Sequence, residues 1–366
     1  MNSVARCGGA ADLEQRTSGL LDWQPLLTAP TLWPCELKHG VQCMIDERFF
    51  QSIQTRELTL RVRVEGQGPL CVLVHGFPES WYSFRHQITA LTAAGYRTAA
   101  LDVRGYGGSD CPSEVAAYSM ESLTADIADV VDALGEEPAI LIGHDWGAPQ
   151  VWQTALRYPD KVRAVVGLSV PYLGRGPAPL IDVLRAIYAD RFFYQIYFQT
   201  PGVAEAEFEA DIEGCLRKLY VGGSAQGIGQ QRGFSAYPEL RDTMFGPVPY
   251  PQELPPWLRQ EDLDYYVAQF QRSGFAGPIH RYRNSERDFA RSAALQGAQI
   301  TQPALFITGA LDEVMHFIPG RRLHDHMDAH YADLRGKHEI DNAGHWVQQE
   351  QPAEVNKRIL AFLAAL

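Results

Sequence analysis

An apolar run that turns sharply into a helix is the feature that most constrains this chain. Residues 139–142 are Ala-Ile-Leu-Ile, and the turn Gly-His-Asp-Trp-Gly follows at 143–147. After the turn, apolar residues recur at the spacing of one helix face, at Ala148, Val151, Trp152, Ala155 and Leu156. A strand, a tight turn with small residues on both sides of its centre, and a buried helix together predict a nucleophile elbow.

The centre of this elbow is Asp145, where the usual esterase elbow has a serine. A carboxylate is already ionised at neutral pH, so its first attack needs no base. Attack on an acyl group would give a reactive anhydride, whereas attack on a saturated carbon with a strained or good leaving group gives an ordinary ester. The residue therefore favours epoxides or alkyl halides as substrates. The alternative is that Asp145 only caps the helix that begins near Trp146.

Composition narrows the class of protein. The chain has 366 residues, 46% of them hydrophobic and 21% charged, which is ordinary for one or two globular domains. Its formal net charge of −12 argues against nucleic acid and anionic membranes as partners. No apolar run approaches the ~18 residues of a membrane span, and no signal peptide is visible. Six cysteines without a C-x-x-C pair indicate thiols, so we expect a cytoplasmic protein.

Changes in the sequence pattern divide the chain into four parts. Residues 1–43 lack sustained periodicity and are predicted to be a loosely ordered N-terminal extension, with Met44 as the natural start in the alternative interpretation. Residues 44–170 alternate strands and helices, as in an α/β protein with a doubly wound, mostly parallel sheet. Residues 171–300 contain aromatic-rich helical patches and are predicted to be an inserted helical lid. The sheet pattern resumes at 301–366 and ends in a helix.

The two core parts contain specific predicted elements. Strands are expected at 55–65, 70–74, 97–101, 162–170, 304–308 and 337–340. Helices are expected at 84–94, 119–134, 321–330 and 352–366. In the first strand the apolar residues share one face, which places Arg61 and Arg63 on the other.

An ester on Asp145 is cleaved by water only if a base activates that water, and a histidine oriented by a second carboxylate is the most plausible base. His345 follows the last predicted strand, and Asp312 follows the strand before it. Carboxyl ends of strands are where open parallel sheets bind ligands. The order Asp145, Asp312, His345 also matches nucleophile, acid and base in folds with this elbow. We predict this triad, with Glu313 and Asp341 as weaker candidates for the acid.

The segment at 75–80, His-Gly-Phe-Pro-Glu-Ser, ends the first buried strand and supplies backbone groups near the elbow. An amide from this segment, with the amide after the nucleophile, forms the oxyanion hole in such folds. We assign the hole to the backbone N–H groups of Phe77 and Trp146, because Pro78 has no N–H. It would act when water adds to the ester carbonyl.

Opening an epoxide creates an alkoxide, which is a poor leaving group unless a proton is donated to it. Two tyrosine hydroxyls that project from the lid would supply that proton. The lid contains many tyrosines, and the chemistry alone does not choose among them. Ordinary packing with a hydroxyl at the surface is the alternative for any single one.

Several of these motifs together resemble the epoxide hydrolases of the α/β-hydrolase fold. The core segments that carry the resemblance are His75–Tyr82, Asp102–Asp110 and Gly143–Gly147. In the lid, the runs at 193–199, 201–205 and 282–284 resemble the soluble epoxide hydrolase branch. The similarity extends over about residues 50–366. It implies an α/β-hydrolase fold with a helical cap and a hydrolase that acts on an ether bond without a cofactor.

The resemblance also implies roles for individual residues. Carried over position by position, it implies Asp145 as nucleophile, Asp312 as acid and His345 as base. The proton-donating tyrosines fall on Tyr194 and Tyr282. The aromatic, apolar lid favours a small hydrophobic epoxide, with water as the second substrate and a vicinal diol as the product. The particular epoxide, its enantiomer and the oligomeric state, monomer or homodimer, remain open.

Two other functions compete with this interpretation. Haloalkane and haloacetate dehalogenases share the nucleophile, acid and base. However, Phe77 stands where haloalkane enzymes usually carry Asn, and Trp146 stands where haloacetate enzymes carry Arg. A non-catalytic receptor on the same fold is the alternative from another class. The complete set of nucleophile, base, acid and two tyrosines argues against it.

Cofactor and metal motifs are weak in this sequence. His324, His326 and His330 suggest a metal site, but no motif completes the ligand set, and a solvated helix face is favoured. The glycines at 105–108 lack the Lys-Ser/Thr ending of a phosphate loop. We therefore expect no metal and no cofactor.

Overall fold

The protein is described here from a computed structural model. The structure describes residues 45–366 except 136, 231–232, 234–235 and 240. The predicted extension at 1–43 therefore lies outside the described residues.

One sheet of eight strands organises the described part of the chain, in the order β1-β2-β4-β3-β5-β6-β7-β8. The pairs β1–β2 and β2–β4 are antiparallel, and all other neighbours are parallel. This confirms the predicted doubly wound, mostly parallel sheet. The strands are β1 Phe50–Gln54, β2 Thr59–Gly66, β3 Leu70–Val74, β4 Arg97–Leu101, β5 Ala139–His144, β6 Val162–Leu168, β7 Ala304–Gly309 and β8 Leu334–Ile340.

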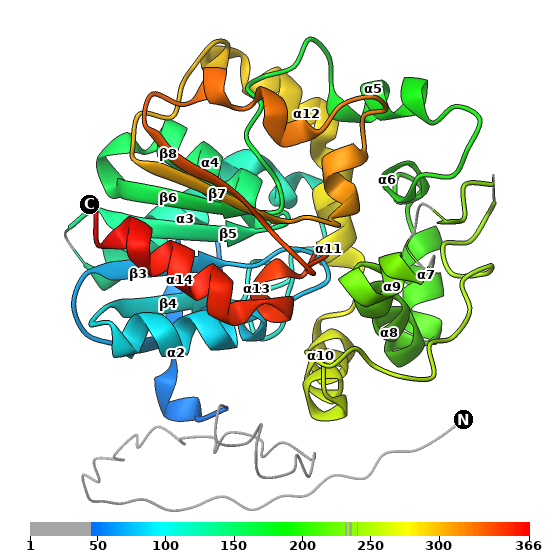
Figure 1. Cartoon of the computed structure of the whole chain (residues 1–366), viewed down its shortest axis with the longest axis horizontal. Coiled ribbons are helices and arrows are strands. Elements are labelled where there is room, and N and C mark those ends of the chain that lie inside the picture. Colours follow the sequence, from blue (N-terminus) through cyan, green and yellow to red (C-terminus); the bar gives the residue numbers. More distant parts are fainter. Residues whose placement is uncertain (1–44, 136, 231–232, 234–235, 240) are drawn as a thin grey trace, which may run out of the picture. The chain divides into compact units, whose positions relative to one another are not determined.

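Helices cover both faces of this sheet (Figure 1). One face carries α2 (Arg85–Ala93) and α14 (Pro352–Leu363), and the other carries α3 (Met120–Leu134) and α4 (Gly147–Arg157). The Ser119 side chain caps α3 by accepting the Ser122 N–H at 3.2 Å. Shorter elements of the core are η1 Glu47–Phe49, η2 Trp81–Phe84, η3 Val115–Tyr118, η4 Pro159–Lys161, η8 Glu313–His316, η9 Leu323–His326, η10 Asp328–His330 and α13 Val347–Glu350.

The chain between β6 and β7 contributes helices joined by loops and no strand of the sheet among its described residues, and it lies beyond the carboxyl ends of the parallel strands, at the right in Figure 1. This confirms the predicted inserted cap, while its limits at 171 and 300 stay a prediction. Its elements are α5 Leu180–Ile187, α6 Tyr194–Tyr197, α7 Val203–Ala210, α8 Ile212–Gly222, α9 Ala225–Gly229, α10 Gln260–Ser273, α11 Ala276–His280, η6 Arg281–Asn284, α12 Ser285–Arg291 and η7 Ala293–Leu295.

The expectation of a helix at 321–330 is wrong. The segment forms two short 3-10 turns, η9 and η10, and His324 is buried rather than on a solvated face. The His324 ring lies between the Met315 sulfur, 3.2 Å away, and Glu339 Oε1 on β8, 3.1 Å away. These tertiary contacts outweigh the local preference for helix. Within the described residues, no group of three His, Cys, Asp or Glu side chains is placed to hold a metal ion.

Arg63 is buried in β2, although it alternates with the apolar residues of this strand. Its side chain is buried because the rings of Phe49 and Trp81 each lie 4.9 Å from its guanidinium carbon. Strand β1 pairs with β2 at this position, where Phe50 lies opposite Arg63. The guanidinium retains a charged partner, since it donates to Glu65 at 2.6 Å.

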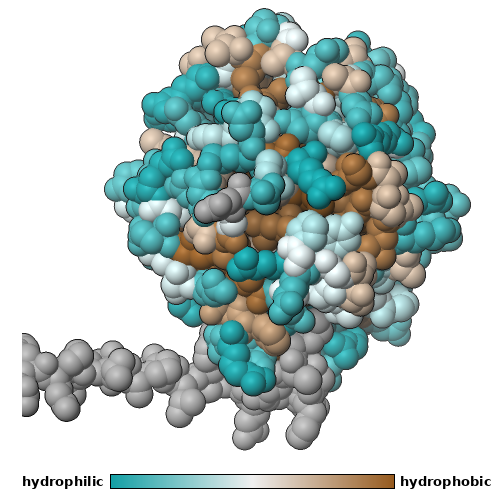
Figure 2. Space-filling model, turned by 90° about the vertical axis from the view of Figure 1, so that its left-hand side faces the viewer, coloured by the Kyte–Doolittle hydropathy of each residue, from teal (hydrophilic) through white to brown (hydrophobic). Residues whose placement is uncertain are grey.

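The surface opposite the cap is mainly hydrophilic at its margins. Figure 2 shows this side of the molecule, with hydrophobic residues gathered toward its centre and hydrophilic residues around them. Across the described chain, no helix combines the length and apolar character needed to cross a bilayer.

The central strand β5 gives a direct test of this packing. Leu141 is fully buried in β5, so we expect Leu141→Ala to lower the free energy of unfolding by about 2–5 kcal/mol. Leu180 at the start of α5 is 48% exposed, and Leu180→Ala should cost less than about 1 kcal/mol. Urea denaturation of the two variants measures the difference. Equal losses would contradict the position of β5 in the core.

Candidate active site

The elbow places Asp145 between β5 and α4 in a conformation that is rare for a residue with a side chain. Asp145 has a φ of 49°, in the left-handed region. A Cβ on Gly143 would stand 2.2 Å from the Gly147 carbonyl oxygen, and one on Gly147 would stand 1.9 Å from the Val74 carbonyl oxygen. The two glycines are therefore required by close backbone approach, and together they force the carboxylate out at the carboxyl end of β5.

The two oxygens of Asp145 have different surroundings. The Phe77 backbone N–H donates to Oδ1 at 2.8 Å, and Oδ2 lies 3.5 Å from Nε2 of His345. Gly76 makes this approach possible, because a Cβ there would stand 2.3 Å from Oδ1 and 2.7 Å from the Trp146 nitrogen. The amide of Trp146 thus adjoins the same carboxylate, at the start of α4.

His345 and Asp312 meet at the ends of β8 and β7, as the sequence predicted. Nδ1 of His345 lies 3.1 and 3.3 Å from the two oxygens of Asp312. Burial raises the pKa of Asp312. The charge and hydrogen bond of His345, together with the Val314 N–H, lower this pKa by more than burial raises it, so the net shift is downward. Glu313 and Asp341 were the weaker candidates, and it is Asp312 that makes these contacts.

The carboxylates on both sides of His345 determine its protonation. Burial lowers the pKa of His345, but the charges and hydrogen bonds of Asp312 and Asp145 outweigh burial and raise the pKa well above its ordinary value. In the unreacted site, therefore, the two neighbouring carboxylates favour the charged form of His345.

A buried network behind His345 was not foreseen from the sequence. The His345 carbonyl oxygen accepts from Nε2 of His144 at 2.8 Å and from Oγ of Ser169 at 2.9 Å. Nδ1 of His144 lies 2.9 Å from Glu79 Oε2, which also accepts the Gly76 N–H. Burial raises the pKa of Glu79, but His144 and this N–H bring it down to about 2. Glu79 and His144 belong to the recognised motifs, but no spacing in the sequence indicates that they meet.

Glu350 is a second residue that the sequence did not single out. Its carboxylate accepts the N–H groups of Gly344 at 3.1 Å, Trp346 at 3.0 Å and Ala225 at 2.8 Å. Burial raises its pKa to about 7. The loop that carries His345 is thus fixed on both sides, and it is tied to α9 of the cap.

Tyr194 and Tyr282 come from separate elements of the cap, α6 and η6, and meet over Asp145. Their ring centroids are 5.8 Å apart, and the Tyr282 ring packs edge-on against Phe77 at 5.5 Å and Trp146 at 5.3 Å. Burial, reinforced by the negative charge of Asp145, raises the pKa of both phenols. Both hydroxyls therefore remain protonated at neutral pH and can donate hydrogen bonds.

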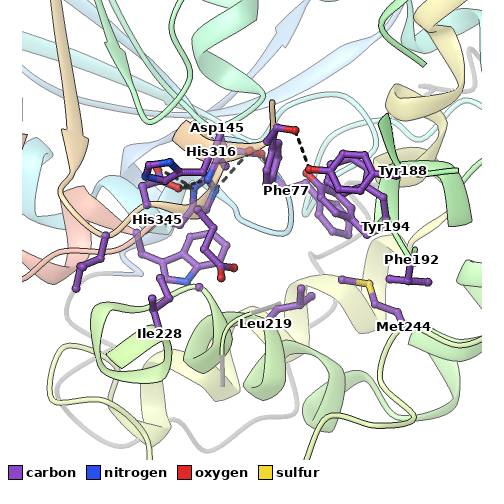
Figure 3. A pocket seen from close by; sticks show the side chains of 18 of the residues that line it. Phe77, Asp145, Tyr188, Phe192, Tyr194, Leu219, Ile228, Met244, His316 and His345 are labelled. Atoms are coloured by element: carbon purple, nitrogen blue, oxygen red, sulfur yellow. Dashed lines mark hydrogen bonds and ion pairs between the residues drawn. The ribbon is translucent and has the colours of Figure 1, made fainter. Parts of the chain in front are cut away.

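These groups border a cavity of about 630 Å³ between the core and the cap (Figure 3). Asp145 and His345 lie across it from Leu219 and Met244 of the cap. The hydroxyl of Tyr188 donates to the Phe317 carbonyl at 2.7 Å, which joins the cap to the segment after β7 at this cavity. Most of the lining is apolar or aromatic and includes Phe77, Phe192, Phe193, Ile228, Phe317 and Trp346.

Known proteins resemble this chain over most of its length. The family model of the alpha/beta hydrolase fold matches residues 69–211. Epoxide hydrolase A of Mycobacterium tuberculosis is 41% identical over 316 residues, which is 86% of this chain and 97% of that protein. The structure of an epoxide hydrolase from an endophytic Streptomyces is 44% identical, with a TM-score of 0.82 over 86% of this chain and 95% of that one. Epoxide hydrolase A from Mycobacterium thermoresistibile is also 44% identical, with a TM-score of 0.78 over 86% and 98%.

The pairing of His345 with Asp312 predicts how the histidine titrates. Asp312→Asn removes one of the two charges that raise the pKa of His345, while burial still lowers it, so this pKa should fall. NMR titration of the imidazole nitrogens measures the shift. Asp341→Asn is the matched control and should leave the pKa of His345 in place. If the pKa of His345 fell in Asp341→Asn and stayed in place in Asp312→Asn, the orienting carboxylate would be Asp341.

Proposed function

This chain belongs to the epoxide hydrolases of the α/β-hydrolase fold, and we propose that it converts a small hydrophobic epoxide and water into a vicinal diol. The family resemblance carried by the core and cap motifs is confirmed by the relatives and solved structures it matches. One observation carries the proposed chemistry. The Asp145 carboxylate faces a largely apolar cavity, beneath Tyr194 and Tyr282 and beside the paired His345 and Asp312.

In the first step, Asp145 is the proposed nucleophile. Its Oδ1 is held by the Phe77 amide, so Oδ2 is the oxygen that attacks an epoxide carbon. The new carbon–oxygen bond forms as the ring carbon–oxygen bond breaks, and the departing oxygen takes a proton from the Tyr194 and Tyr282 pair. The phenol regains its proton from solvent. The product is an ester between Asp145 and the alkyl group.

Alkylation then changes the charge around the base. Ester formation removes the negative charge of Asp145, one of the two carboxylates that raise the pKa of His345. The pKa of His345 therefore falls at the stage when a neutral imidazole is needed. Asp312 continues to orient the ring through Nδ1, which leaves Nε2 directed at the ester.

In the second step, His345 takes a proton from water as the water oxygen adds to the ester carbonyl carbon. The resulting negative charge develops on Oδ1, which is already bonded to the Phe77 N–H, and the Trp146 N–H is the proposed second donor. Collapse breaks the ester bond, and the diol oxygen takes the proton back from the imidazolium. The Asp145 carboxyl group then releases to solvent the hydroxyl proton that came from water, which restores its carboxylate, with no cofactor in the scheme.

The size and lining of the cavity favour an uncharged substrate. A volume of about 630 Å³ accommodates an aryl or alkyl epoxide, and the lining offers more apolar than polar surface. We propose such a compound as substrate. Its epoxide oxygen and the attacking water would interact with the polar groups near Asp145.

We also propose a cytoplasmic location, which rests on the cysteines. Cys71, Cys111 and Cys215 are free thiols in the structure, as is usual in a reducing compartment. Assaying cell fractions for the diol-forming activity tests this placement.

The nucleophile is tested by one turnover in oxygen-18 water, with the enzyme in excess over an aryl epoxide. Water attacks the ester carbonyl in this scheme, so the label should enter the Asp145 peptide while the first diol stays mainly unlabelled. Mass spectrometry of peptide and diol measures both. Asp145→Ala should form no diol. Label in the diol alone would mean that water attacks the epoxide directly.

The role of His345 predicts that the two steps separate. His345→Gln should still form the ester and then stall, because nothing removes the proton from water. In the unmodified enzyme, ester hydrolysis should slow as pH falls, since protonated His345 cannot accept a proton; rapid-quench mass spectrometry of the ester measures this rate. Rapid multiple turnover by His345→Gln would contradict the assignment of the base.

A further inference from the structure

Some of the recognised cap motifs have no part in the proposed chemistry. The run Pro-Gly-Val-Ala-Glu at 201–205 and the Arg283 that follows Tyr282 are the main examples. In the structure these two motifs meet each other beside the tyrosine pair. Their contacts indicate a task for them, and the inference below rests on the proposed function.

Arg283 joins the ends of two cap segments. Its Nε donates to the Phe198 carbonyl at 2.8 Å, and its Nη2 donates to the Thr200 carbonyl at 3.1 Å. Both carbonyls belong to the chain that leaves α6, the helix that begins with Tyr194. Because Arg283 itself is adjacent to Tyr282, one guanidinium links the backbones that carry both hydroxyls.

Glu205 completes this link on the other side of the guanidinium. Its oxygens accept from Nη1 of Arg283 at 2.5 Å and from Nη2 at 3.0 Å, a two-pronged ion pair. Glu205 Oε2 also accepts the Gly202 N–H at 3.0 Å, which fixes the start of α7. Nη1 lies a further 3.0 Å from Nδ1 of His280, on α11. The side chains of Arg283 and Glu205 are only 5% and 11% exposed, so each buried charge is stabilised by the opposite charge of the other.

Gln199 adds a direct bridge between the tyrosine segments. Its Nε2 donates to the Gln195 carbonyl at 2.8 Å on α6 and to the Tyr282 carbonyl at 3.1 Å. The two elements that carry the tyrosines, α6 and η6, have only four residues each. A helix of that length does not hold its position by its own hydrogen bonds. The spacing of the hydroxyls must therefore be fixed from outside these elements.

We propose that Arg283 and Glu205 are positioning residues, which fix Tyr194 and Tyr282 relative to each other and thereby determine the rate of epoxide ring opening. Neither residue lines the cavity. Lysine at 283 would keep the charge but lose the planar fork, and so could not bind two carbonyls and the carboxylate at once.

The experiment compares Arg283→Lys with Arg217→Lys in single-turnover reactions with an aryl epoxide, in which ester formation and ester hydrolysis are followed separately. Arg217 forms the matched control, since it also pairs with a glutamate, Glu213, at 2.8 Å in the cap. Arg283→Lys should slow ester formation roughly ten- to hundredfold. Ester hydrolysis should stay within about twofold, and Arg217→Lys should leave both steps within the same range.

A second comparison separates positioning from general loss of structure. If Arg283 acts through the tyrosines, Arg283→Lys should slow ester formation less in a Tyr194→Phe background than in the unmodified enzyme. Equal slowing in both backgrounds, or equal slowing of both steps, would overturn the inference. So would unchanged ester formation in Arg283→Lys. Absence of diol from the unmodified enzyme would instead overturn the proposed function.

Discussion

The close approach of backbone around Asp145 is the constraint on which the rest of the site depends. β5 and α4 can meet through so short a turn only because Gly143 and Gly147 have no side chains. The turn holds Asp145 at a φ of 49°, a conformation that costs free energy and that the surrounding core must maintain. This conformation projects the carboxylate from the end of a central strand toward the segments that follow β3, β7 and β8.

Charge balance then determines what the site can do. One imidazole lies between two carboxylates, whose charges and hydrogen bonds raise the pKa of His345. A reaction that neutralises one carboxylate releases the histidine to act as a base. The first half of the proposed reaction therefore prepares the second. The buried network of His144, Ser169 and Glu350 holds the His345 backbone in place through this change.

The cap supplies what the sheet does not. The strand ends provide the proposed nucleophile, base and acid, and the cap provides the proposed proton donors for the alkoxide. Tyr194 and Tyr282 provide hydroxyls that burial keeps protonated, and they do so from two short elements. The contacts of Arg283, Glu205 and Gln199 join the two cap segments that carry these tyrosines.

The sequence by itself determined the sheet, the inserted helical cap and the residues of the elbow, because buried parallel strands and tight glycine turns leave strong local patterns. The candidate residues Asp145, Asp312 and His345 also followed from it, since each comes directly after a strand. Only the tertiary structure decided that Glu79, His144 and Glu350 support His345, that Arg63 is buried, and that 321–330 is not a helix. The physical reason is that these features depend on hydrogen bonds and ring contacts between residues far apart in the chain, which no local spacing encodes.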